Sequence, residues 1–149
     1  MGTRSHTYII EKVTDTDQAT NEPITREHTY SKVYKQFDGY PDGYGVELAN
    51  FLLSRKLVNG IGTDRNVFNG VGCLAAAHVA HFKTEAGGIY MCPTEHNDEG
   101  VSYAYYVTIT WNFPDKFSIN MVVKGGYTGE VEFDGTPEEF LNSKLVKGE

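Results

Sequence analysis

The feature that most constrains the fold is a regular alternation of side chains between residues 101 and 112. Every second position carries a large apolar or aromatic residue: Val101, Tyr103, Tyr105, Val107, Ile109 and Trp111. An alternation of period two separates the two faces of a β-strand. The pattern therefore predicts a long, half-buried strand, with Tyr106 on the face opposite Tyr105.

The same period continues along the chain. Residues 117–124 alternate in the same way, Gly125-Gly126 is a two-residue hairpin signal, and residues 127–134 predict a third strand. Residues 3–13 and 28–37 are rich in β-branched and aromatic side chains and predict two further strands. We expect the polar stretch around 14–27 to be a mobile loop between these two.

Helical patterns separate the strands. Residues 46–57 carry an apolar stripe, and the alanine-rich residues 73–83 predict a short, tightly packed helix. Thr136, Pro137 and Glu139 form a capping-box sequence that predicts a C-terminal helix. Residues 1–149 are thus expected to form one α+β domain, a single antiparallel sheet of about five strands with two or three helices packed on one face.

Charge and composition restrict the function. The net charge is −7, which disfavours direct binding to nucleic acid, where a basic face provides the attraction. Apolar stretches are far shorter than a membrane span. Both cysteines, Cys73 and Cys92, are expected to be free thiols in a cytoplasmic protein without membrane contact.

Two stretches resemble small proteins encoded by bacteriophages and prophages. They are the start Met1-Gly2-Thr3-Arg4-Ser5 and the segment Tyr34-Lys35-Gln36-Phe37-Asp38-Gly39-Tyr40-Pro41-Asp42-Gly43-Tyr44-Gly45. The resemblance covers about the first third of the chain. It implies a phage origin and a setting in the host cytoplasm, and it supplies no catalytic residues.

The segment 38–45 is a candidate ligand site, because backbone amides that lead into a helix can hold an anion. Asp38 and Asp42 would repel a phosphate, however, and turn chemistry explains every residue type in the segment. In that second interpretation the glycines make turns, and Tyr40 and Tyr44 pack the segment onto the sheet.

Motifs for cofactors and metals are weak. The sequence Gly70-Val71-Gly72-Cys73-Leu74-Ala75 matches a dinucleotide fingerprint, but no long strand precedes it and no parallel strand with an acid follows, so we expect no cofactor. His78 and His81 are the weak metal candidates, and no zinc-type spacing supports them.

Ten tyrosines exceed what a core requires, and amphipathic rings favour recognition surfaces. We expect a homo-oligomeric, non-enzymatic phage accessory protein with a role in counter-defence that binds a host protein or sequesters a small nucleotide-like ligand. The alternatives are a small phage enzyme acting on a nucleotide or related metabolite and a virion or assembly component. The candidate ligand-binding residues are Arg4, His6, Asp38, Tyr40, Asp42, Tyr44, Arg65 and Tyr106.

Overall fold

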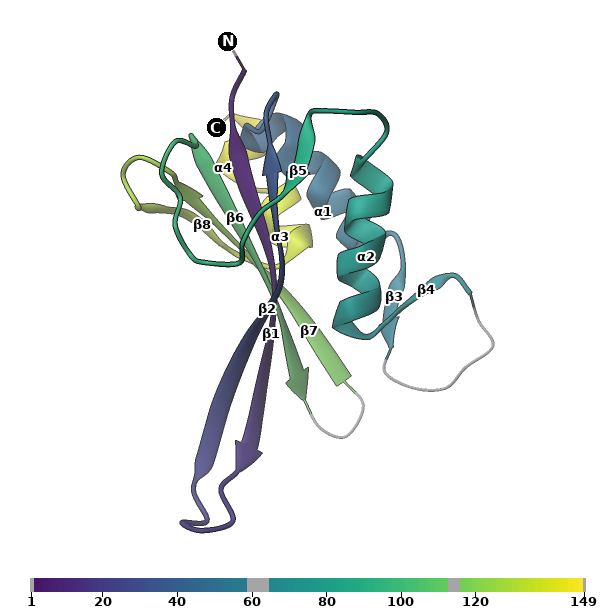
Figure 1. Ribbon diagram of the computed structural model, residues 1–149, viewed down its shortest axis with the longest axis vertical. Helices are drawn as coiled ribbons and strands as arrows, with labels where there is room; N and C mark the ends of the chain where they lie inside the picture. The colour runs from purple at the N-terminus through teal and green to yellow at the C-terminus, as the bar shows by residue number, and fades with distance from the viewer. Residues whose placement is uncertain (1, 59–64, 113–115, 149) are drawn as a thin grey trace.

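The computed structural model describes residues 2–58, 65–112 and 116–148. Within these ranges the chain is α+β, as predicted, with a mostly antiparallel main sheet (Figure 1). The strands of this sheet follow one another in the order β5-β2-β1-β6-β7-β8. They are β1 (Ser5–Thr16), β2 (Pro23–Lys35), β5 (Ile89–Met91), β6 (Tyr103–Asn112), β7 (Lys116–Gly125) and β8 (Val131–Gly135).

The sheet is mixed, which corrects the prediction of a wholly antiparallel one. β1 and β6 lie side by side and run parallel, from Ser5 opposite Tyr103 to Val13 opposite Trp111. The other neighbouring strands pair antiparallel. Hairpin signals in a sequence determine local pairings, whereas the direction in which two distant segments pair carries no local signal.

The segment around 14–27 is a β-hairpin rather than a loop. β1 continues to Thr16 and β2 begins at Pro23, with Thr14 opposite Thr25 and Asp15 opposite Ile24. The polar sequence predicts a loop because both faces of this hairpin are largely exposed, whereas its threonine and isoleucine residues favour strands. The hairpin projects away from the rest of the fold (Figure 1).

The first face of the sheet carries the main core, which includes Ile9, Tyr105, Val107 and Ile109 from β1 and β6. Helices contribute the facing side chains: Leu48 and Leu52 from α1, Leu74 from α2 and Phe140 from α3. These elements are α1 (Val46–Leu53), α2 (Gly70–Phe82) and α3 (Pro137–Leu141), with the short α4 (Lys144–Lys147) after them.

Other element boundaries also differ from the predicted ones. α1 ends at Leu53, where the Ser54 hydroxyl donates to the Phe51 carbonyl at 2.6 Å, and residues 56–58 form β3 (Lys56–Val58), which pairs with β4 (Val67–Asn69). α2 begins at Gly70 rather than at residue 73. β8 begins at Val131, after a turn in which Gly129 N donates to the Gly125 carbonyl at 2.8 Å.

The second face of the sheet carries a smaller apolar cluster formed by Tyr8, Ile10 and Ala104, with Tyr106 against it. Residues 92–100, here called the strap, join β5 to β6 and cross in front of β1 and β2 in Figure 1. Tyr105 and Tyr106 therefore lie on opposite faces, as the alternation predicted.

Candidate functional site

The carboxylate of Asp98, in the strap, contacts three polar side chains on the second face of the sheet. Asp98 Oδ1 accepts a hydrogen bond from the Tyr8 hydroxyl at 2.7 Å, and its Oδ2 accepts one from the Tyr106 hydroxyl at 2.5 Å. His6 Nδ1 lies 2.9 Å from Oδ1. A carboxylate can only accept, so the hydrogen of this third contact is carried by Nδ1.

These contacts keep Asp98 ionised. Burial alone would raise the pKa of its carboxyl, but the hydrogen bonds from His6, Tyr106 and Tyr8 outweigh burial and lower the pKa to about 2. Burial and the neighbouring carboxylate raise the pKa of Tyr8 and of Tyr106 above the ordinary tyrosine range. The carboxylate is therefore charged and both phenols are protonated throughout the neutral range.

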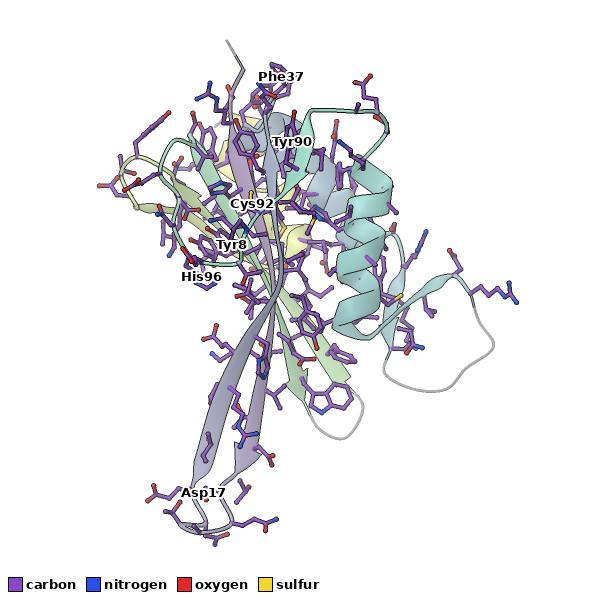
Figure 2. The ribbon with its side chains drawn as sticks, viewed as in Figure 1. Tyr8, Asp17, Phe37, Tyr90, Cys92 and His96 are labelled. Carbon is purple, nitrogen blue, oxygen red and sulfur yellow. The ribbon has the colours of Figure 1, made fainter. Side chains whose placement is uncertain are left out.

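The same residues form an aromatic cluster. The rings of Tyr8 and Tyr106 stack with centroids 4.4 Å apart, and the His96 ring of the strap lies 5.0 Å from Tyr8. Lys124 Nζ lies 4.7 Å from the centre of the Tyr106 ring. Figure 2 shows Tyr8 and His96 close together at the front of the sheet.

Hydrogen bonds from Lys32 hold the strap against β2. Its ammonium group donates to the carbonyl oxygens of Glu95 and Asn97 at 2.8 and 2.9 Å, and only 6% of the residue is exposed. The Thr29 hydroxyl of β2 and His96 Nε2 of the strap lie 2.9 Å apart and form a second contact between strap and strand. Beside Lys32 a cleft of about 320 Å³ opens, lined by Lys32, Pro93, Glu95, Asn97 and Glu99.

Two further rings lie on this face. Tyr34 stands two residues beyond Lys32 on β2 and is paired with Tyr90 of β5, with ring centroids 6.1 Å apart. The Tyr34 ring is 6.0 Å from that of His6. Tyr90 is 47% exposed, and Lys83 Nζ lies 5.5 Å from the centre of its ring, so part of this aromatic surface is open to a ligand.

A second network of hydrogen-bonded side chains is buried under α2. The Tyr44 hydroxyl contacts Thr7 Oγ1 at 2.7 Å and His78 Nε2 at 2.9 Å, and all three residues are buried. Among the described residues, His78 Nδ1 has no hydrogen-bond partner. Burial, and to a smaller extent His81, lower the pKa of His78 to about 4, so its ring is neutral at pH 7.

The structure brings together two of the predicted site residues, His6 and Tyr106, through Asp98. Arg4 is exposed, and its carbonyl accepts from Ser102 N at 2.9 Å beside the same face. Arg65 is exposed just before β4, and β4 lies apart from the strap in Figure 1.

The predicted residues of segment 38–45 have a separate setting. Tyr44 is part of the core, and the Gly39 carbonyl accepts a hydrogen bond from Tyr105 at 2.7 Å. Asp38, with a φ of 58°, and Asp42 are exposed, and Tyr40 is 39% exposed. Through Tyr44 and the Gly39 carbonyl, the segment packs against the sheet.

Sequence reasoning missed Tyr8, Lys32 and Asp98, and it also missed the ring pair and cleft residues Tyr34, Tyr90, Glu95, Asn97 and Glu99. Strand parity offered a signal for Tyr8, because it shares a face with His6 two residues earlier. Lys32 and Asp98 could not be found in this way, since their partners belong to segments far away in the sequence.

No group of three or more potential metal ligands occurs among the described residues. His78, one of the two weak metal candidates, is buried against Tyr44, and His81 is exposed on α2. In the described part of the chain, no helix has both the length and the apolar character needed to cross a bilayer.

Comparison with known proteins gives no relative: no family model, no curated protein and no solved structure matches this chain.

Proposed function

We propose that this chain is a non-enzymatic phage accessory protein that sequesters a small nucleotide-like ligand in the host cytoplasm. The observation that carries the proposal is the open aromatic surface of Tyr34 and Tyr90 beside the strap cleft. A planar base can stack on such rings, and stacking on an aromatic side chain contributes about 1–3 kcal/mol per base. The phage assignment rests on the resemblance of residues 1–5 and 34–45.

The cleft next to these rings suits the sugar of such a ligand. Glu95, Glu99 and Asn97 provide oxygen acceptors for ribose hydroxyl groups, a role that acidic side chains have in many nucleotide sites. A volume of about 320 Å³ is at the lower end of ordinary ligand pockets and suits one nucleoside unit. The two carboxylates oppose phosphates inside the cleft, so any phosphate of the ligand would point to solvent.

The titration behaviour of the cluster favours binding over catalysis. General acid–base groups work best when their pKa lies near the working pH. The pKa of Asp98 is about 2, and the pKa values of Tyr8 and Tyr106 are raised above the ordinary range. Each group therefore keeps one protonation state near neutral pH, which suits a fixed binding surface.

The test is a calorimetric titration of the chain with nucleosides, nucleoside monophosphates and cyclic nucleotides, followed by recovery of the ligand. We expect saturable binding and an unchanged ligand. Tyr90→Ala should weaken binding about 5- to 100-fold by loss of a stacking surface, while Tyr127→Ala, a matched change at a residue that is 74% exposed, should have no effect.

Conversion of the ligand would contradict sequestration and favour the enzyme alternative. If no compound of the panel bound, and a host protein were retained from lysate by the wild-type chain, the masking of a host protein would replace the proposal. Tyr90→Ala binding as tightly as wild type would exclude this surface as the site.

A further inference from the structure

The distal part of the β1–β2 hairpin, residues 14–25, forms a projecting arm with an acidic character. It carries Asp15, Asp17 and Glu22 and contains no lysine or arginine. Asp17 lies near the tip, far from the helices (Figure 2). An isolated two-stranded ribbon is only marginally stable in water, so an arm of this length gains stability when another surface covers it.

One face of the arm combines apolar and acidic side chains. Asp15 and Ile24 are directly opposite in the register, so their side chains lie on the same side of the ribbon. Val13 precedes Asp15 by two residues and shares this side, as does the basic residue Arg26, which is directly opposite Val13 in the register. Ile9 of β1 has the same parity and lies in the main core, so this face of the arm continues the helix-bearing face of the sheet.

A groove of complementary character lies on that same side. It is an open cavity of about 560 Å³ whose lining includes Leu53, Leu57, Phe117 and Ile119 together with the basic residues Arg55 and Lys56. Leu53 at the end of α1 is 43% exposed and so is accessible in the groove. Within the described ranges, no carboxylate forms an ion pair with Arg55 or Lys56.

We propose that the groove is occupied by the arm of a second copy of this chain, so that two copies form a dimer by reciprocal docking. Ile24 and Val13 would cover the apolar floor, and Asp15 would approach Arg55 and Lys56. The charges are opposite in sign, and each side offers both an apolar and a charged part, as the core and rim of an interface require.

The positions of arm and groove favour a closed dimer. Val13, at the base of the arm, pairs with Trp111, and the Trp111 ring lies 4.3 Å from that of Phe117 in the groove. Arm and groove are therefore continuous on one side of the molecule. A single two-fold rotation can then bring each arm to the partner's groove, which closes the assembly at two copies. The inference does not depend on the ligand proposed above.

The test is sedimentation velocity of the full chain over a range of micromolar concentrations. We expect a dimer that weakens as salt is added, because the contact includes opposite charges. Asp15→Lys and Arg55→Glu should each raise the dimer dissociation constant about tenfold or more, since each places like charges in contact. A chain that carries both substitutions should restore the dimer, because the charges are exchanged rather than removed.

The control places the same added charge on the opposite face of the arm. Thr16→Lys with Thr25→Lys changes the net charge as much as Asp15→Lys does and should leave the dimer intact. Lys56→Glu provides a second groove variant in case Arg55→Glu, whose guanidinium lies 5.5 Å from the Phe68 ring centre, disturbs the fold. A wild-type chain that stays monomeric at high micromolar concentration, or a dimer that the arm and groove variants leave unchanged, would overturn the proposal.

Discussion

At the scale of single residues, Asp98 is the side chain that connects the strap to the sheet. It accepts hydrogen bonds from Tyr8, Tyr106 and His6, which come from two strands. A hydrogen bond to a charged group contributes about 1.5–3 kcal/mol, and a buried donor left without a partner is costly. The strap is therefore held by this carboxylate, by the Lys32 ammonium and by the contact between His96 and Thr29.

Asp98→Asn should lower the free energy of unfolding by about 1–3 kcal/mol, because an amide is a weaker acceptor and cannot serve all three donors. Urea unfolding followed by fluorescence measures this loss. Glu99→Gln removes the same charge one residue later, where the side chain is exposed, and should change the stability by less than about 0.5 kcal/mol. Equal effects of the two substitutions would contradict the role given to Asp98.

A second residue-scale prediction concerns pH. The pKa of His78 is about 4 in the fold against 6.5 for the unperturbed group, so the unfolded chain takes up a proton at a higher pH than the folded chain does. Its contribution to stability is complete above pH 6.5 and decreases as the pH falls towards 4. The difference corresponds to about 3 kcal/mol.

His78→Gln should remove most of this dependence, since glutamine does not titrate. The measurement is the free energy of unfolding at pH 7 and at pH 4 in both chains. His81→Gln, a matched change at an exposed histidine of the same helix, should retain most of the wild-type dependence, because burial is the larger cause of the lowered pKa of His78. If His78→Gln lost as much stability on acidification as wild type, His78 would not be the neutral, buried group described here.

At the scale of elements, α3 shows how much a local sequence can determine. The Thr136 hydroxyl accepts from Glu139 N at 3.1 Å, and the Glu139 carboxylate accepts from Thr136 N at 2.8 Å, which is the predicted capping box. α3 spans only five residues. Such a short helix depends on its cap and on Phe140, which is fully buried in the core.

Thr136→Ala should lower the free energy of unfolding by about 1 kcal/mol through loss of the N-cap. Thermal or urea unfolding would detect this change. Glu138→Ala in the same first turn leaves the capping box intact and should cost at most a few tenths of a kcal/mol. A Thr136→Ala chain as stable as wild type would show that the cap contributes nothing to the docking of α3.

Sequence predicts best those elements whose whole pattern lies within a short stretch of the chain. The strand at 103–112 and the start of α3 are of this kind. The arm was mistaken for a loop, because a strand pattern normally requires one buried face and the arm buries neither. The parallel pairing of β1 with β6 joins residues about a hundred positions apart, and no short-range pattern encodes it.

At the scale of the whole molecule, the two faces of the sheet pack against different parts of the chain. The first face buries the core against α1, α2 and α3, and the second carries the strap, the aromatic cluster and the cleft. Strand parity assigned Tyr105 and Tyr106 to these faces in advance. The site as a whole could not be predicted, because Asp98 reaches it from a segment without regular secondary structure, and only the path of the strap places it there.

The proposed function requires that the second face binds a small nucleotide-like ligand through Tyr34, Tyr90 and the strap cleft. The most direct measurement is a titration of the isotopically labelled chain with nucleosides and cyclic nucleotides, followed by amide chemical shifts in NMR spectra. We expect saturable shifts concentrated in residues 32–34, 90 and 93–99. Shifts confined to other parts of the molecule, or none with any compound, would contradict it.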